Sequence, residues 1–455
     1  MNLRLPFGLN LSRAPQATRK ERIRARFDGA GMGRSLRGYT PPLAHINTLL
    51  ASGGTRLLAR IRDMEVNNAH IARAARMWPA YAVGVGIMPA PRIADDGARK
   101  ANDDLWWRWT DEADFDGATD FYGLQSLAAR EAYVGGEAFV LREEGTFAEA
   151  PLALRVLGAE MLPFDAVGMA ANGNIIRTGI EMDPRGRRVA YHFYGAHPGD
   201  VTEWGRAQLP RIRIPAEDVC HIYDPLQAGQ LRGVSTVAAA VLRLHLLTRY
   251  DEAELERQRT AALFAGFVTR SVEDLDDNAI AAVFGTREDE DEGEVPALEP
   301  GAMAELEPGE DVKFSDPPQL AGAFEAFQYR SLTAIAAALD LPYHTLTNDP
   351  VKANFGSTRA VQLDFKRRVD AYQNNVMIFK LCRRVRQWFD LAAQLAGADM
   401  LDSPVIVDWV PPAWDWIDPL KDALAEEKRI ENETLSKREA VERQGRPDTA
   451  DLPEQ

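Results

Sequence analysis

Hydrophobic positions recur every three or four residues over much of the chain, and the longest such pattern covers residues 231–271. It predicts one helix of about thirty residues, roughly 45 Å long at 1.5 Å per residue. Ser235 is placed to cap its N-terminus, and neither Pro nor Gly interrupts it before Gly266. Its first half is apolar and its second half is charged. Because helices in globular proteins average about 11–12 residues, this one is either a core helix of a large domain or a strut that packs against copies of itself.

Three other segments carry the same helical spacing. Residues 42–81 and 321–341 are predicted to be helical, and residues 357–396 are predicted to form a third long helix that Ser357 caps. The apolar stripe of this last helix advances in steps of three or four residues. Its members are Val361, Phe365, Val369, Tyr372, Val376, Phe379, Cys382, Val385, Phe389 and Ala392.

Between residues 121 and 223 the pattern changes from helical to strand-like. An amphipathic helix at residues 121–133 is followed by a Gly-Gly turn and a strand at residues 137–142. Further strands, separated by turns rich in Asn, Gly and Pro, include residues 175–183, which read as one strand, and residues 188–194. These segments predict an α+β lobe with an antiparallel sheet.

Two short stretches in the first half of the chain have no clear period. Residues 82–89 alternate Gly with β-branched residues, which predicts a short strand or a tight crossing of two backbones. Trp106, Trp107 and Trp109 cannot all face one way. Packing in a core or an interface is therefore favoured for them, with stacking on nucleic-acid bases as the alternative.

Composition narrows the class of protein. A chain of 455 residues is expected to form two to four domains or lobes. No transmembrane helix is predicted, because no run of eighteen apolar residues occurs. No secretory signal is predicted, because the N-terminus has no apolar h-region. Cys220 and Cys382 are the only cysteines, which excludes a disulfide framework and fits a reducing compartment. The net charge of −15 argues against a protein that coats nucleic acid by bulk attraction.

That charge is unevenly spread. Residues 1–38 are basic and are predicted to be a flexible arm, which is either solvated or docks onto an acidic partner or nucleic acid. Residues 287–311 carry eleven carboxylates and a single base, Arg287. Like charges this dense repel one another, so a solvated acidic lobe or loop is expected there. Their spacing does not match a calcium-binding loop.

Signatures of catalysis are absent from the sequence. It contains no Walker-type phosphate loop, zinc-protease motif, C-x-x-C pair or nucleophile elbow. His221 is expected to pack at a strand end rather than bind metal, and we expect no catalytic residue, no metal and no cofactor. The alternative is a metal-dependent nuclease that uses the carboxylates at 288–311. Two-metal sites, however, take their ligands from separate rigid elements.

Several segments, in their order and spacing, resemble one known family. They include RIRDMEVNNAHIARA, VGVGIMP, LEPGEDVKFSDP, ANFGSTRAVQLDFKR and WDWIDPLKDALAE. From about Arg56 to Asp448 the chain resembles the portal proteins of tailed bacteriophages, specifically the lambda-like portal family. Another ring-forming head–tail connector is a further alternative, but such connectors are usually far shorter.

The resemblance implies an α+β, portal-type fold whose parts follow the chain in order. These parts are a flexible basic N-terminal arm (1–38), an α+β wing (39–230), stem helix 1 (231–270), an acidic clip (271–320), stem helix 2 (321–343), a tunnel loop (344–357), a tunnel helix with a wing return (358–418), and a helical crown and tail (419–455).

The resemblance also implies a function and partners. Portal proteins form a ring, usually a dodecamer, at one capsid vertex of the virion, and double-stranded DNA is packaged and ejected through it. The large terminase and later the head–tail connector proteins would dock on the clip, while the major capsid protein and scaffold would surround the ring. Assembly would take place in the host cytoplasm, without a membrane and without catalysis by this chain.

Two sets of residues follow from this resemblance as candidate sites. The tunnel loop would line the DNA channel, and the clip would carry a carboxylate cluster that docks partners. A channel that passes DNA must not grip it, because many cationic contacts would hold the duplex by counterion release. The tunnel-loop candidates are Lys352, Asn354, Phe355 and Arg359, and the docking candidates are Glu288, Asp289, Glu290, Asp291 and Glu292.

Overall fold

The computed structural model describes most of the chain, which divides into two units, Met1–His45 and Ile46–Gln455. The described residues are 34–200, 210–263, 267–270, 310–313, 321–349, 355–397, 405–414, 419–437 and 440–441. In the first unit they include one short 3-10 helix, η2 (Arg34–Leu36). Residues 1–33, the greater part of the predicted basic arm, lie outside the described residues.

The second unit begins with the predicted helical segment, which consists of two helices, α1 (Ile46–Asn67) and α2 (Ala69–Ala82). They are separated at Asn68, whose side chain accepts hydrogen bonds from the first amides of α2 and so caps it. Helix α2 packs on α4 (Phe121–Val134), where the rings of Trp78 and Tyr133 stack with centroids 5.0 Å apart. These helices form the centre of the main hydrophobic core.

Residues 83–85 of the glycine-rich stretch after α2 form a turn, and the strand predicted there begins only at Met88. The close contact at Gly86 is with a side chain and not with a second backbone. Gly86 has a φ of +127°, and a Cβ atom there would lie 2.4 Å from the ring of Tyr122. Only glycine fits both constraints. Strand β1 (Met88–Pro91) follows and pairs antiparallel with β12 (Val407–Val410), which joins the Trp-rich segment near the C-terminus to this part of the fold.

Helix α3 (Asp96–Thr110) carries the three tryptophans. Trp106 and Trp109 are buried and pack against Phe121 and Phe389, whereas the side chain of Trp107 is 47% exposed. The Trp109 indole N–H donates to the Leu152 carbonyl at 2.8 Å. Core packing is therefore confirmed for two of the three indoles.

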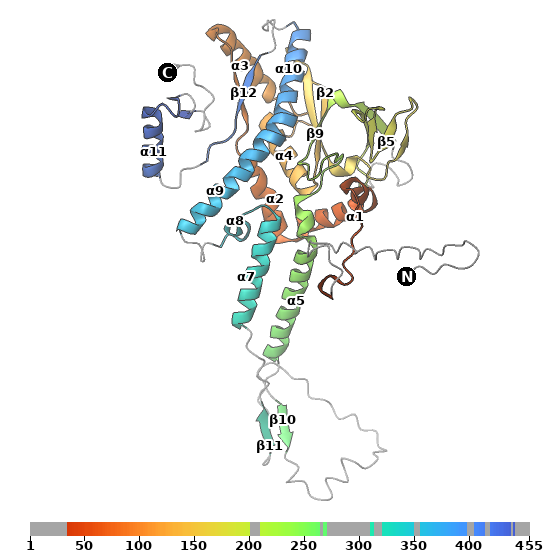
Figure 1. The fold of residues 1–455 in the computed structure, drawn as a ribbon, viewed down its shortest axis with the longest axis vertical. Coiled ribbons are helices and arrows are strands. Elements are labelled where there is room, and N and C mark those ends of the chain that lie inside the picture. Colours follow the sequence, from red (N-terminus) through yellow and green to blue (C-terminus); the bar gives the residue numbers. More distant parts are fainter. Residues whose placement is uncertain are drawn as a thin grey trace, which may run out of the picture. The chain divides into compact units, whose positions relative to one another are not determined.

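Two antiparallel sheets form the predicted α+β lobe (Figure 1). The first has the strand order β3-β2-β9, with β2 (Ala138–Glu144) between β3 (Leu152–Gly158) and β9 (Val219–Ile222). The second is a meander of β4 (Gly168–Met169), β5 (Ile175–Arg177), β6 (Ile180–Met182), β7 (Arg188–Tyr194) and β8 (Arg211–Pro215). A second core that includes Phe139, Tyr191 and Phe193 lies between the two sheets.

The prediction of one strand over residues 175–183 is wrong. Thr178 and Gly179 have φ angles of +48° and +83°, and the chain reverses there between β5 and β6. Two successive residues with positive φ match the right-handed twist of a two-residue hairpin. A threonine at such a position gives little warning in the sequence, because β-branched residues rarely adopt positive φ.

The longest predicted helix is shorter than its pattern indicated. Helix α5 is Val241–Leu263, 23 residues or about 35 Å at 1.5 Å per residue. It follows a 3-10 turn, η5 (Thr236–Ala239), and Ser235 caps that turn rather than α5 by accepting from the Val237 amide. The region assigned to stem helix 1 (231–270) also contains strand β10 (Phe267–Arg270), which pairs with β11 (Glu310–Lys313).

The returning helix is confirmed as α7 (Ala321–Ala338). Part of the predicted tunnel loop is helical instead, since α8 covers Tyr343–Thr347. The next helix begins at Phe355, so Ser357 lies inside it and does not cap it. It continues through α9 (Phe355–Tyr372), a π-helical segment η7 (Gln373–Cys382) and α10 (Arg383–Leu395).

The π-helical segment η7 changes which side chains of this long helix face the core. Its wider turn moves the apolar stripe by one position, so Ile378 is buried and Phe379 is 62% exposed. Val361, near the start of the helix, is also exposed, at 46%. The other predicted members from Phe365 to Phe389 are buried as expected.

The C-terminal charged helix, α11, covers Pro419–Glu431 and is shorter than the crown segment predicted for it. Glu433 has a φ of +57°, and the Thr434 amide donates back to the Arg429 carbonyl, which ends the helix. Among the described residues, no helix combines the length and apolar character that crossing a membrane requires.

Candidate functional site

Helices α5 and α7 lie side by side and run in opposite directions (Figure 1). Tyr250 of α5 contacts the rings of Phe324 and Phe327 of α7, with centroids 5.8 and 5.0 Å apart. The Gln328 side-chain amide donates to Asp251 at 2.8 Å. At the other end of the pair, Leu244 and Ile335 are buried in the main core, which joins that end of the pair to the rest of the chain.

One face of α5 carries exposed apolar side chains. Leu242 and Leu246 are 68% and 58% exposed, and they lie one turn apart on the helix. Leu244, on the opposite face, is buried. Exposed leucines in a row on a helix are a typical feature of a surface that another chain covers.

Only some of the predicted channel residues fall in the described part of the chain. Lys352 and Asn354 lie outside it, as do the five docking carboxylates at 288–292. Phe355 is the first residue of α9, and Arg359, which is half-buried, lies four residues later in that helix. The structure therefore places two of the candidates together at the beginning of α9.

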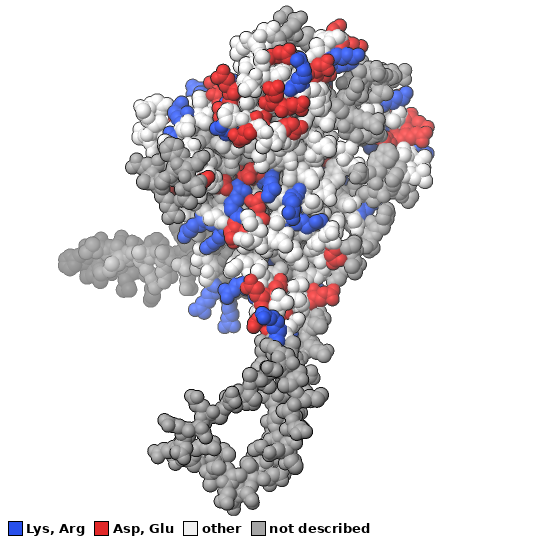
Figure 2. Space-filling model, turned by 180° about the vertical axis from the view of Figure 1, so that it is seen from behind, with Lys and Arg blue, Asp and Glu red and all other residues white. Residues whose placement is uncertain are grey.

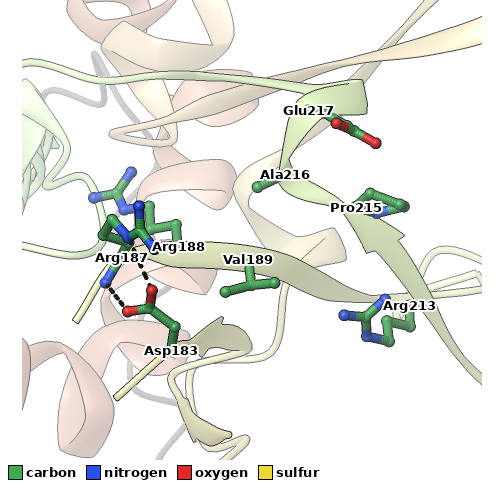
Figure 3. A pocket seen from close by; sticks show the side chains of 8 residues that line it. All are labelled: Asp183, Arg187, Arg188, Val189, Arg213, Pro215, Ala216 and Glu217. Atoms are coloured by element: carbon green, nitrogen blue, oxygen red, sulfur yellow. Dashed lines mark hydrogen bonds and ion pairs between the residues drawn. The ribbon is translucent and has the colours of Figure 1, made fainter. Parts of the chain in front are cut away.

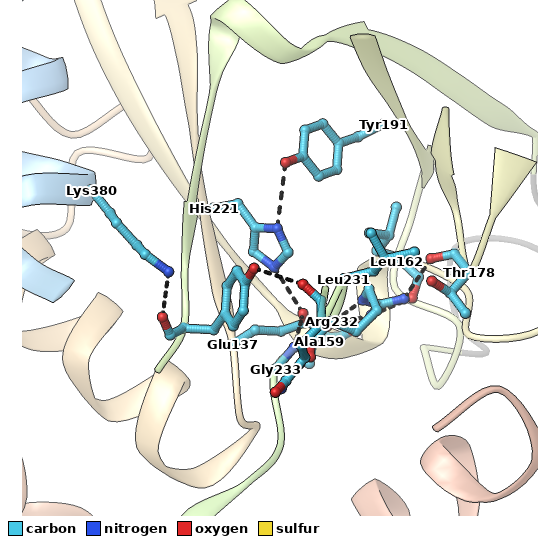
Figure 4. Close-up of polar contacts among 12 residues, drawn as sticks. Glu137, Ala159, Leu162, Thr178, Tyr191, His221, Leu231, Arg232, Gly233 and Lys380 are labelled. Atoms are coloured by element: carbon cyan, nitrogen blue, oxygen red, sulfur yellow. Dashed lines mark hydrogen bonds and ion pairs between the residues drawn. The ribbon is translucent and has the colours of Figure 1, made fainter. Parts of the chain in front are cut away.

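A buried ionic network, which sequence reasoning missed, lies where the chain enters η5 and α5 (Figure 4). We call it the stem-base network: Glu137, Arg188, His221, Arg232 and Gly233. The side chains of Glu137 and Arg232 are fully buried. The Arg232 Nε–H donates to Glu137 Oε1 at 2.6 Å, and the Gly233 amide donates to Glu137 Oε2 at 2.7 Å.

Arg232 uses its remaining N–H groups on backbone carbonyls from three other places in the chain. It donates to Thr178 at 2.8 Å, to Ala159 at 3.2 Å and to Leu162 at 2.9 Å. The guanidinium also lies 4.1 Å from the centre of the Phe164 ring. One side chain thereby fixes the segment before α5 to both sheets of the α+β lobe.

Glycines make this approach possible. A Cβ atom at Gly233 would lie 2.0 Å from the carbonyl oxygen of Gly136, and the φ of Gly136 is +91°. The two backbones are in direct contact, which any larger side chain at position 233 would prevent. The sequence indicated only a turn at the Gly-Gly pair before β2. In the structure this turn contacts Gly233 of the stem-base network.

The protonation states in this network follow from its geometry. His221 Nδ1 lies 3.1 Å from Arg188 Nη1, which can only donate, so the neutral ring carries its proton on Nε2 and donates to Glu137 at 2.8 Å. Burial lowers the pKa of His221 to about 4, although Glu137 opposes the shift. Burial alone would raise the pKa of Glu137, but Arg232 and His221 outweigh it and lower that pKa to about 2.

The network continues to the long helix through Tyr223. Arg188 donates to the Tyr223 hydroxyl at 2.6 Å. Lys380, in the π-helical segment, donates to the Tyr223 carbonyl at 2.5 Å and lies 3.7 Å from the ring centre. Burial lowers the pKa of Lys380 to about 8. Strand β9, the segment before α5 and the long helix are thus joined by one set of polar contacts.

An open hollow lies beside β7 and β8 (Figure 3). Its arginines are already engaged. Arg187 pairs with Asp183 at 2.8 Å, Arg213 pairs with Glu181 at 2.8 Å, and Arg188 belongs to the stem-base network. The described residues also contain no group of three His, Cys, Asp or Glu side chains arranged to hold a metal ion.

Charged side chains are unevenly distributed on the face shown in Figure 2. Basic side chains lie mainly across its middle and toward the α5/α7 end, and acidic side chains lie mainly toward the opposite end. The two signs are interspersed, and the described part of this face has no continuous basic band of the kind that grips a nucleic-acid backbone.

Comparisons with known proteins identify the family. A family described as phage portal protein, lambda family, matches residues 32–373. The chain belongs to the lambda family of phage portal proteins. A protein of Halomonas phage phiHAP-1 named "Probable portal protein" is 26% identical over 407 residues, which cover 86% of this chain and 77% of that protein. Portal protein B of Escherichia phage lambda is 20% identical over 366 residues, which cover 73% of this chain and 68% of that protein.

A solved structure shares the fold of this portal protein. It is the neck of an empty gene transfer agent particle, computed with C6 symmetry, with a TM-score of 0.50 and 16% identity. The match covers 86% of this chain and 93% of the chain in the neck structure. The predicted α+β portal-type fold is confirmed.

Membership of the family establishes the general function. This portal protein forms a homo-oligomeric ring in a phage particle, at a vertex of the capsid, and the ring is the channel through which DNA is packaged. It is a structural protein and not an enzyme, so the family sets aside the alternative of a metal-dependent nuclease. The alternative of a different head–tail connector is set aside by the same match.

Proposed function

We propose that twelve copies of the chain assemble with their α5/α7 pairs side by side as the stem of the ring. In this arrangement α5 is stem helix 1 and α7 is stem helix 2. Double-stranded DNA would pass through this stem in one direction during packaging and in the other during ejection.

The observation that carries this proposal is the exposed apolar face of α5. Leu242 and Leu246 are exposed, although Leu244, between them in the sequence, is buried in the main core. In a closed ring each copy presents different surfaces to its two neighbours, so an apolar face on one side of the helix pair is expected to be covered by the next copy. Burying such leucines favours association by roughly 25 cal/mol per Å² of apolar surface.

The other parts of the chain take their roles from this arrangement. Lys352, Asn354, Phe355 and Arg359 would line the channel, where a ring of cations from Lys352 and Arg359 would steer DNA without holding it. The carboxylates at 288–292 would dock the large terminase and then the head–tail connectors. Assembly would begin in the host cytoplasm, among the scaffold and major capsid proteins.

A double substitution on α5 tests the stem assignment. Leu242→Ser with Leu246→Ser removes both exposed leucines and leaves the core untouched. Native mass spectrometry and negative-stain images should show rings of about twelve copies for the wild type and free monomers for the variant. The melting temperature of the variant monomer should equal that of wild-type monomer.

Val66→Ser provides the control. Val66 lies on α1 and is 80% exposed, so its replacement removes a comparable apolar side chain away from the stem. This variant should assemble as the wild type does. Intact rings from the double variant would overturn the assignment of α5 to the ring interface.

A further inference from the structure

A second ionic contact joins the end of α7 to the long helix. Arg368 of α9 donates through Nη2 to Asp224 at 2.9 Å and through Nε to Asp340 at 3.0 Å. Asp224 lies two residues after β9, and Asp340 lies two residues after α7. We call these three residues the α7–α9 joint. It connects the stem pair, the long helix and the sheet lobe through one guanidinium.

Asp340 occupies a position that ordinarily selects glycine. Its φ is +54°, and the amides of Asp340 and Leu341 donate to the Ala337 and Ala336 carbonyls. These two bonds form a Schellman motif, whose left-handed residue is usually Gly because a Cβ atom is disfavoured there. An aspartate at this position disfavours the helix end locally. Its carboxylate, however, provides half of the pairing with Arg368.

Beneath the joint, two buried polar atoms have no hydrogen bond of normal geometry within the described residues. They are the Trp78 indole nitrogen and the Tyr372 hydroxyl, whose rings meet edge to face with centroids 5.2 Å apart. The Arg368 guanidinium lies 5.7 Å from the centre of the Trp78 ring. Buried polar groups normally find partners, and the Tyr372 hydroxyl would accept from Arg368 if the guanidinium moved inward.

The joint is also accessible to water. The side chains of Arg368, Asp224 and Asp340 are 35%, 40% and 41% exposed. Ion pairs exposed to this extent contribute little to stability, and salt weakens them. An aspartate at a left-handed position, a weak ion pair and an unsatisfied Tyr372 hydroxyl beneath it contribute little to the stability of a fold. They are suited to holding one helix at a defined position that can be released.

We propose that Arg368 and Asp340 are positioning residues for the passage of DNA. Together with Asp224 they hold α9 against the end of α7, and thereby set the position of the segment that precedes α9. The inference rests on the proposed function, in which that segment faces the channel.

The decisive variant is Asp340→Gly. It removes the carboxylate and at the same time supplies the residue that the left-handed position favours. If Asp340 were only part of a helix end, this change would do no harm. If it positions α9, phage particles built with the variant should protect several-fold less DNA from nuclease than wild-type particles. The variant rings should form normally and melt at or above the wild-type temperature. Arg368→Gln should lower DNA protection in the same way.

Glu433→Gly is the matched control. Glu433 is an exposed acid at a left-handed helix end, with a φ of +57°, and its helix ends with the same pair of backbone bonds. Its replacement makes the same chemical change away from the joint. Particles with Glu433→Gly should protect as much DNA as the wild type. Equal DNA protection by Asp340→Gly and Glu433→Gly particles would overturn the inference.

Two further measurements distinguish failure of this inference from failure of the proposed function. Hydrogen exchange of the α9 amides should be faster in Asp340→Gly rings than in Glu433→Gly rings, and equal rates would overturn the joint. Lys352→Glu tests the channel assignment separately. If Lys352→Glu particles package DNA normally while α9 exchanges faster in Asp340→Gly rings, the joint stands and the lining role of Lys352 fails.

Discussion

Helices α5 and α7 are attached to the rest of the chain by two different kinds of ionic contact. The stem-base network, at the start of α5, holds Glu137 and Arg232 with their side chains completely out of water. The α7–α9 joint, at the end of α7, leaves more than a third of each of its side chains exposed. Breaking the contact before α5 is therefore expected to cost much free energy, whereas breaking the contact after α7 is expected to cost little.

The difference follows from desolvation. Removing one partner of a buried pair strands the other charge away from water, which costs about 3–5 kcal/mol. Removing one partner of an exposed pair lets water solvate the other, and such pairs contribute about 0–1 kcal/mol. The burial of the charges, rather than the number of hydrogen bonds, thus decides whether the contact is fixed or can adjust.

The largest expected effect comes from Arg232→Met. Glu137 would then remain buried with its main counter-charge removed, and three backbone carbonyls would each lose one hydrogen-bond donor. The free energy of unfolding should fall by about 3–5 kcal/mol, measured by urea denaturation of the purified chain. Adding Glu137→Gln removes the stranded charge and should restore part of that loss. A single variant as stable as the wild type would contradict the role of the stem-base network as an anchor.

Much of the fold could be predicted because it depends on local patterns. The spacing of apolar residues located α2, α4 and α7, and the turn residues located most of the strands. Errors arose where a longer-range contact overrides the pattern. Residues 236–239 carry a helical pattern but form the 3-10 turn η5. This turn directly follows Arg232 and Gly233, which contact Glu137 and Gly136, residues distant in sequence.

The π-helical segment shows a second limit of sequence reasoning. Steps of three or four residues describe an apolar stripe equally well before and after a shift of one position, so the pattern could not reveal that Ile378 replaces Phe379 in the core. The hairpin at Thr178 is a similar case. Its positive φ comes from the pairing of β5 with β6 and not from any preference of threonine.

The candidate site was only partly predictable. The order of elements, together with the family resemblance, led to the stem helices and to the beginning of α9, where Phe355 and Arg359 lie. Glu137, Arg232 and Arg368 gave no signal as single charges in a chain that is 27% charged. Asp340 could have been noticed, since an aspartate followed closely by Pro342 at the end of an apolar helix indicates a left-handed helix end.

Acid should weaken the stem-base network through His221 first and through Glu137 at lower pH. The pKa of His221 is about 4 in the fold and 6.5 in the unfolded chain, so the unfolded chain binds this proton more readily between these values. The stability that His221 contributes is therefore complete above about pH 6.5 and is lost as the pH falls toward 4, on the order of 3 kcal/mol in total. The contribution of Glu137, whose pKa falls from 4.5 to about 2, is lost only below about pH 4.5.

Urea denaturation of the wild type and of His221→Gln at several pH values checks this expectation. Glutamine can still donate to Glu137, but it does not titrate. Between pH 6.5 and 4 the wild type should lose stability more steeply than the variant. Parallel stability curves over that interval would show that His221 is not the group that senses acid.

The smallest effect on stability is expected from Arg368→Gln, and its size sharpens the contrast between the two contacts. Because all three side chains of the α7–α9 joint are partly solvated, the free energy of unfolding should change by no more than about 1 kcal/mol. Raising the ionic strength to about 1 M shortens the Debye length to about 3 Å, so the difference between wild type and variant should shrink further in high salt. The effect of Arg232→Met should hardly change, since salt does not reach a buried pair.

Urea denaturation of both variants at low and high salt measures the two responses side by side. A large, salt-independent loss for Arg368→Gln would mean that the joint is a second anchor, and that α5 and α7 are fixed to the rest of the chain in the same way.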